Sequence, residues 1–174
     1  GAATPADAPN RFVINIQPDQ ADAFKAQLRQ FGVQQFDWYP MIRARLVAVN
    51  GKTVRPDDYT EERAQRLLDR EFNLSYAATA PIYNPVVAGR YQTNEAGALS
   101  VEAGLAKTLG LHLNDTLTFD MAGVVHQGRI TSLRKVDWAS MRVNFFVMAP
   151  MAAMPEWPAT YISAFRVPPG SKLD

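Results

Sequence analysis

The chain has 174 residues, of which 47% are hydrophobic and 20% charged, and its formal net charge is +1. This is ordinary globular composition for one domain or two small subdomains, which argues against wholesale disorder and against nucleic acid as a partner. Cysteine is absent, which excludes disulfides, thiolate metal sites and cysteine nucleophiles.

The N-terminal part of the chain predicts a strand followed by a helix. Residues 1–9 are rich in Ala and Pro and are expected to form a flexible lead-in. Residues 11–17 form a β-branched run of strand length. Apolar residues then recur at helical spacing over residues 21–31, and Gly32 is placed to end this helix in a left-handed conformation.

A second strand and a tight turn follow. Residues 41–49 alternate between apolar and polar side chains, with Arg43 and Arg45 on one face. Asn50-Gly51 is a strong hairpin signal. Residues 11–54 therefore predict a βαβ-like unit of the kind found in split βαβ, ferredoxin-like layers.

The next segment predicts a short helix, a strand and a loop. Asp58 begins a sequence that resembles a capping box, so a helix is expected from there to about Glu71. Residues 72–79 have the composition of a strand. Residues 81–94 contain two prolines and a glycine, which indicates a loop.

A third helix and a β-hairpin are predicted after residue 99. Ser100 is expected to cap a helix that ends at Gly110 in a left-handed turn. Residues 116–121 and 124–133 both alternate, with Ala122-Gly123 between them, and together they predict a hairpin.

The stretch from Arg134 to Phe146 predicts the end of one strand, a turn and the start of another. We expect Asp137 and Trp138 to fix the turn and Asn144 to satisfy main-chain groups. Either Phe145 or Phe146 should enter the core, because alternate residues of a strand face opposite sides. A strand over 143–148, a loop over 150–158 and a last strand over 160–167 complete the chain.

No motif in the sequence indicates catalysis or metal binding. Gly51-Lys52-Thr53 resembles the end of a P-loop, but Leu46 stands where the motif needs glycine. His112 and His126 lack metal-ligand spacing, and we expect both on the surface. There is no Gly-x-Ser-x-Gly elbow, and nothing singles out a carboxylate pair. We therefore predict no catalytic residue, no cofactor and no metal.

One loop is a candidate contact surface for a partner or an apolar ligand. Met151, Met154 and Trp157 lie in a proline-rich segment, and methionine-rich surfaces adapt to varied apolar partners. Packing into the core and exposure on the surface are about equally compatible with this pattern.

The amino-acid sequence resembles the large periplasmic region of FtsX/MacB-type ABC transporter permeases, and within them a YbbP-like branch. Asp137, Trp138, Asn144, Phe145 and Phe146 form part of that signature. The resemblance runs in order over about residues 10–167, in the segments 11–18, 41–46, 70–75, 99–102, 115–119, 131–134, 137–138, 144–146 and 160–163.

The resemblance implies an α+β fold with two subdomains. A βαβ porter-like subdomain, half of a ferredoxin-like layer, would comprise residues 10–54 and 160–174. Residues 55–159 would form a helical linker and an inserted, mostly antiparallel β subdomain of the Sabre type. The chain would lack a second βαβ half, so we expect an exposed apolar sheet face or edge that dimerisation would cover.

The resemblance also implies a non-enzymatic function. The domain would lie on the periplasmic side of the inner membrane, tethered by the membrane helices of the full-length permease. It would couple motion driven by a cytoplasmic ABC ATPase subunit to export or extraction of a hydrophobic or lipid-like compound. A periplasmic lysophospholipase or thioesterase-like protein would be a partner. The alternative is a periplasmic module that binds a small apolar ligand or docks a partner protein.

Overall fold

The structure is a computed structural model that describes residues 8–171. Most of the predicted lead-in and the last three residues of the predicted 160–174 segment lie outside the described residues. Internal contacts divide the chain into two compact units. Within the described residues, the first unit comprises 8–41, 137–144 and 159–171, and the second comprises 42–136 and 145–158.

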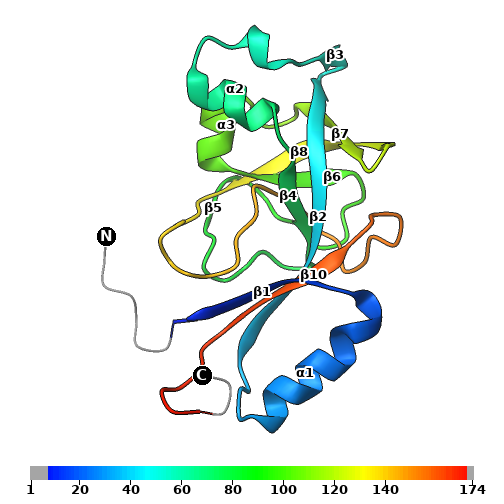
Figure 1. Cartoon of the computed structure of the whole chain (residues 1–174). Coiled ribbons are helices and arrows are strands. Elements are labelled where there is room, and N and C mark those ends of the chain that lie inside the picture. Colours follow the sequence, from blue (N-terminus) through cyan, green and yellow to red (C-terminus); the bar gives the residue numbers. More distant parts are fainter. Residues whose placement is uncertain (1–7, 172–174) are drawn as a thin grey trace. The chain divides into compact units, whose positions relative to one another are not determined.

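The first unit is a three-stranded sheet with one helix (Figure 1). Strand β10 (Thr160–Phe165) is the middle strand and pairs antiparallel with β1 (Arg11–Ile16) and with the first half of β2 (Phe36–Val49). Strands β1 and β2 therefore run parallel. A 3-10 turn, η1 (Pro18–Gln20), and helix α1 (Ala21–Gln30) connect them. This is the split βαβ topology that the sequence predicted.

Helix α1 covers one face of this sheet. The apolar residues that pack between helix and strands are Leu28, Val33, Phe165 and Val167, with Val13, Phe24 and Phe36 partly buried against them. Gly32, with φ +86°, ends the helix as predicted. Phe12 and Ile14 alternate with Val13 along β1 and are exposed on the other side of the strand.

The second unit is built on a closed ring of strands. Hydrogen-bonded pairs lead from β2 through β4, β9, β6, β8 and β7 and back to β2. Two of its eight strand pairs, β4–β9 and β6–β8, are parallel and the others antiparallel. The elements are β3 (Lys52–Thr53), η2 (Pro56–Asp58), α2 (Glu62–Leu68), β4 (Phe72–Tyr76), β5 (Val86–Gly89), β6 (Ala98–Glu102), α3 (Ala103–Leu109), β7 (Thr116–Met121), β8 (Val124–Arg134) and β9 (Val147–Ala149).

The ring encloses the core of the second unit. Its strands contribute most of the large side chains that are fully buried, among them Phe72, Phe119, Ile42, Leu74, Leu117, Ile130 and Met148. Closing a sheet on itself removes free edges, and β5 is an additional strand paired with the end of β8. The predicted α+β class is confirmed; the closure of the ring was not predicted.

Two predicted helix caps are wrong. The Asp58 carboxylate accepts the N–H of Arg55 and closes η2 (2.8 Å), while α2 begins only at Glu62. Ser100 is buried within β6, and the Glu102 carboxylate caps α3 through the N–H of Leu105. Strand β6 runs directly into α3, and its last residue, Glu102, is the cap. The sequence therefore shows no turn residue that would mark the start of the helix.

Two strands also differ from the prediction. Residues 86–89 form β5 inside the predicted loop, and β9 begins at Val147 rather than Val143. In addition, residues 42–54 group with the second unit, because that half of β2 pairs with β3, β4 and β7. The porter-like and Sabre-like labels remain predictions.

Candidate functional site

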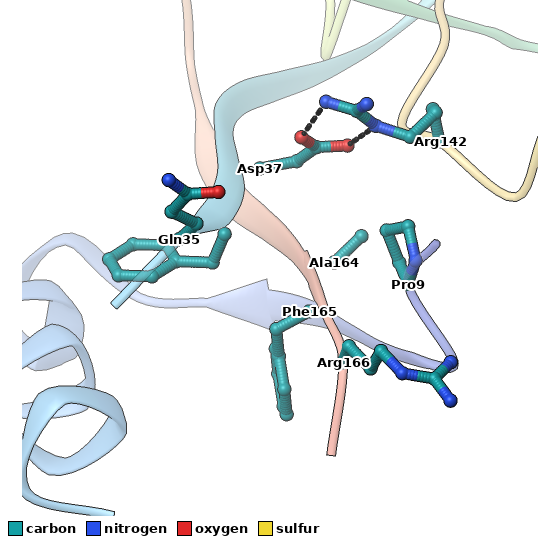
Figure 2. Close-up of a pocket in the computed structure, with 8 residues that line it drawn as sticks. Pro9, Gln35, Asp37, Arg142, Ala164, Phe165 and Arg166 are labelled. Atoms are coloured by element: carbon teal, nitrogen blue, oxygen red, sulfur yellow. Dashed lines mark hydrogen bonds and ion pairs between the residues drawn. The ribbon is translucent and has the colours of Figure 1, made fainter. Parts of the chain in front are cut away.

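The clearest polar arrangement in the first unit joins Asp37 of β2 to Arg142 (Figure 2). The Arg142 guanidinium donates from Nη2 to Oδ1 (2.7 Å) and from Nε to Oδ2 (3.0 Å), and the Val143 N–H also donates to Oδ2 (3.1 Å). The Asp37 side chain is only 9% exposed. Bidentate, charge-assisted bonds of this kind are among the strongest in proteins, so they fix residues 137–144 to the strand.

This pair borders a hollow of about 190 Å³. Figure 2 shows Gln35, Ala164, Phe165, Arg166 and Pro9 around it. Small-molecule sites usually enclose roughly 300–1,000 Å³ and are mainly apolar. The hollow is smaller and bears two guanidinium groups, so we interpret the Asp37–Arg142 pair as a clasp that positions a loop.

The loop held by this clasp, residues 137–144, is called the Trp138 loop below. Asp137 fixes its turn as expected, because Oδ1 accepts the Ala139 N–H (3.0 Å) and the main-chain carbonyl accepts the Ser140 N–H (3.1 Å). The Asn144 amide donates to the Arg142 carbonyl (3.3 Å), again as expected. Trp138 and Met141 are exposed by 48% and 43%.

The expected strand at the end of this loop starts later than predicted, since residues 135–146 contain no regular strand and β9 begins at Val147. Phe145 nevertheless enters the core and is 2% exposed. Phe146 is half-buried, with its ring 5.7 Å from that of Phe72. Both aromatic side chains therefore pack, although only one was expected to do so.

The predicted contact surface divides between core and surface. Trp157 is 8% exposed and packs against Tyr76 and His126, with ring centroids 6.4 and 6.5 Å away. Met151 and Met154 are half-buried. A buried Trp157 has little surface to offer a partner, so the predicted surface is reduced to the two methionines and stays a prediction.

Arg134, at the end of β8, is fully buried in the second unit. Its guanidinium donates to Ser100 Oγ (2.9 Å), Asn84 Oδ1 (2.8 Å) and the Phe145 carbonyl (2.9 Å). It thereby joins three segments that are distant in sequence. The sequence placed Arg134 at a strand end but did not predict its burial, because an arginine there is usually exposed.

The two histidines are differently placed. His112 lies on an exposed turn, where its main-chain N–H donates to Asp115 Oδ2 (2.8 Å). The side-chain hydrogen bond from Asn50 lowers the pKa of Asp115, and the N–H and charge of His112 add to this, although burial opposes it. His126 was expected on the surface, but it is half-buried against Trp157, since that loop covers it. Within residues 8–171, no three His, Cys, Asp or Glu side chains are placed to hold a metal ion.

The prediction that Gly51-Lys52-Thr53 belongs to a hairpin is confirmed. Asn50 and Gly51 have φ values of 53° and 79°, as a tight hairpin turn requires, and β3 pairs with the end of β2. Asn50 also reaches another turn, since its Nδ2 donates to Asp115 Oδ1 (3.0 Å) and its Oδ1 accepts the Thr116 N–H (2.9 Å).

Comparison with known proteins finds a similar sequence within a permease. No family model matches it. Over 162 residues, 93% of the chain, it is 40% identical to the uncharacterized ABC transporter permease YbbP of Escherichia coli K12, and it spans 19% of that protein's length. A crystal structure of a domain from a candidate permease of Porphyromonas gingivalis matches 83% of this chain and 67% of its own, with a TM-score of 0.49 and 14% identity. No helix within residues 8–171 is long and apolar enough to span a bilayer.

Proposed function

Because the chain is homologous to a segment of an ABC transporter permease, we propose that it is an extracytoplasmic domain of such a permease, of the FtsX/MacB type. The single observation that carries this proposal is the 40% identity over 162 residues to YbbP. The domain would lie on the periplasmic side of the inner membrane, between membrane helices of the full-length protein. The porter-like and Sabre-like labels would apply to the first and second units.

The domain would act mechanically rather than catalytically. In a transporter that couples two sites, each rigid element must move between discrete positions. Both units are suited to transmit such motion, because their loops are tied to strands by arginine side chains. A cytoplasmic ATPase subunit would drive the motion, and export or extraction of a hydrophobic or lipid-like compound would be the result.

Exposed sheet surface supports a docking role for the first unit. Phe12 and Ile14 of β1 are exposed, and within the described residues β1 pairs only with β10. Such an edge is available for pairing with another chain. Dimerisation through this edge, or docking of a periplasmic lysophospholipase or thioesterase-like partner, belongs to the proposal.

Cysteine labelling tests the location. The chain has no cysteine, so Gln127→Cys, at an exposed position of β8, introduces one thiol into the domain, and any cysteine in the rest of the full-length permease is replaced by serine. In intact cells that express the full-length permease, a membrane-impermeant maleimide should label this thiol. Labelling only after cell lysis would contradict an extracytoplasmic location.

Replacement of the domain tests its function. Exchanging residues 11–165 of the full-length permease for a flexible linker should leave assembly with the ATPase intact. It should abolish ATP-dependent release of a fluorescent long-chain fatty acid from vesicles. Release at the unmodified rate would remove the domain from the transport mechanism.

A direct assay tests the claim that the domain is not an enzyme. The purified chain should not hydrolyse p-nitrophenyl esters or phosphates above the background rate. Hydrolysis that is lost in His126→Ala or His112→Ala would show instead that the chain is catalytic.

A further inference from the structure

We propose that the Trp138 loop contacts the lipid interface, with Trp138 and Met141 inserted among the headgroups of a bilayer. The loop presents two large apolar side chains, exposed by 48% and 43%, within four residues of each other. This inference rests on the proposed function, since an extracytoplasmic permease domain works close to a membrane.

The backbone at Met141 indicates that its side chain has a role. Met141 has φ +61°, a left-handed conformation that disfavours residues other than Gly, Asn and Asp. Elsewhere the described residues meet this requirement mainly with glycine and, after it, with asparagine. The other described non-glycine residues with positive φ are Asn15, Asn50, Asn94, Asn114 and Ala122. Met141 is the one long apolar side chain among them, and backbone strain of this kind concentrates at functional sites.

The loop is braced from inside, and its charged residues flank the tip rather than lie within it. The Asp137 carboxylate accepts the Ala139 N–H (3.0 Å), and Arg142 is paired with Asp37. The four residues between them, 138–141, are uncharged. Residues 138–141 can therefore enter an interface without carrying a charge of their own into it, which would be costly.

The chemistry of the tip favours lipid over protein. Tryptophan prefers the interfacial region of bilayers, where its ring is in contact with both apolar and polar groups. A stable protein interface buries about 800 Å² on each partner, far more than two side chains offer. Two side chains bind a membrane weakly, but a domain tethered to that membrane experiences millimolar effective concentrations.

The second unit provides a matched control. Val124 and Val125, next to the Ala122-Gly123 turn of the β7–β8 hairpin, are exposed by 58% and 62%. They are more exposed than Trp138 and Met141, but they are aliphatic and lack an aromatic anchor. If exposure alone caused lipid contact, this tip would insert as well.

Bromolipid quenching tests the proposal. The chain, carrying a C-terminal histidine tag, is captured on phosphatidylcholine vesicles that contain a nickel-chelating lipid, with or without phosphatidylcholine brominated near the headgroup. Trp138 is the reporter, because Trp157 is buried and Trp38 half-buried. We expect clear quenching for the unmodified chain and little for Trp138→Phe, which removes the reporter.

Met141→Asn is the decisive variant, because asparagine suits the left-handed backbone and the chain should fold at least as well. We expect its quenching to fall several-fold while its thermal midpoint is equal or higher. The double variant Val124→Ser/Val125→Ser should be quenched like the unmodified chain.

Two outcomes would overturn the proposal. One is absence of quenching in the unmodified chain. If quenching is absent and Met141→Asn still impairs the full-length permease, the loop contacts a protein partner and not lipid. The other is quenching that Met141→Asn leaves unchanged. Labelling of Gln127→Cys in cells tests the location separately, so that failure of the lipid contact is distinguishable from failure of the proposed function.

Discussion

The two units fix their irregular segments with the same residue type in different surroundings. In the first unit, Arg142 is partly exposed and pairs with the Asp37 carboxylate on an open sheet. In the second, Arg134 is fully buried in a closed ring of strands and donates to an amide, a hydroxyl and main-chain carbonyls. The partly exposed Arg142 can turn to water if its partner is lost, so the first unit tolerates change at this contact. Arg134 cannot reach water, so the second unit depends on all of the hydrogen bonds that its guanidinium makes.

The largest effect is expected from Arg134→Met. Removing the guanidinium leaves Asn84 and the Phe145 carbonyl without this donor in a buried interior, which should cost about 4 kcal/mol of unfolding free energy. Guanidinium denaturation measures the loss, and hydrogen exchange should locate it in the second unit. Lys135→Met, at the exposed neighbouring position, should change stability by less than about 0.5 kcal/mol.

A smaller loss is expected from Asp37→Ala. Three hydrogen bonds to a mostly buried carboxylate disappear, but Arg142 can turn toward water, so the cost should be about 2 kcal/mol. The fluorescence anisotropy of Trp138 should fall as the loop loosens. Gln34→Ala, an exposed change in the same unit, should leave both signals as they were. A loss as large as that of Arg134→Met would erase the contrast between the units.

Asp115→Asn tests a pH-dependent contact in the second unit. The pKa of Asp115 is lowered in the folded state, so its carboxylate stabilises the fold at pH above the ordinary aspartate pKa of about 3.9. That stabilisation is lost as pH falls through the lower folded-state pKa. The variant should be less stable by about 1 kcal/mol at pH 7. Urea titrations should show the gap closing at acidic pH; a constant gap would contradict the assignment.

The smallest effect is a gain. Met141→Asn should raise the unfolding free energy by about 0.5–1 kcal/mol, because asparagine tolerates left-handed backbone better than methionine. Differential scanning calorimetry measures this. Destabilisation would indicate instead that the Met141 side chain packs within the first unit and stabilises it.

Local patterns made much of the fold predictable from sequence. The alternation of Ile42, Ala44 and Leu46, all buried, and the turn at Asn50-Gly51 depend on near neighbours in the chain. Contacts between distant residues were not predictable: Asp37 and Arg142 are 105 residues apart. Burial of Trp157 likewise depends on which strand its loop covers, and periodicity does not encode that.

The order of strands in the first unit has a consequence for biogenesis. Strand β10, made from residues 160–165, lies between β1 and β2, so β1 has no described partner until residues 160–165 have been made. Residues 42–158 contain every strand pair of the second unit. During synthesis or passage across a membrane the second unit can therefore fold first, while residues 8–41 remain without their central strand and expose apolar side chains. Aggregation and chaperone binding are expected at segments that stay unpaired in this way.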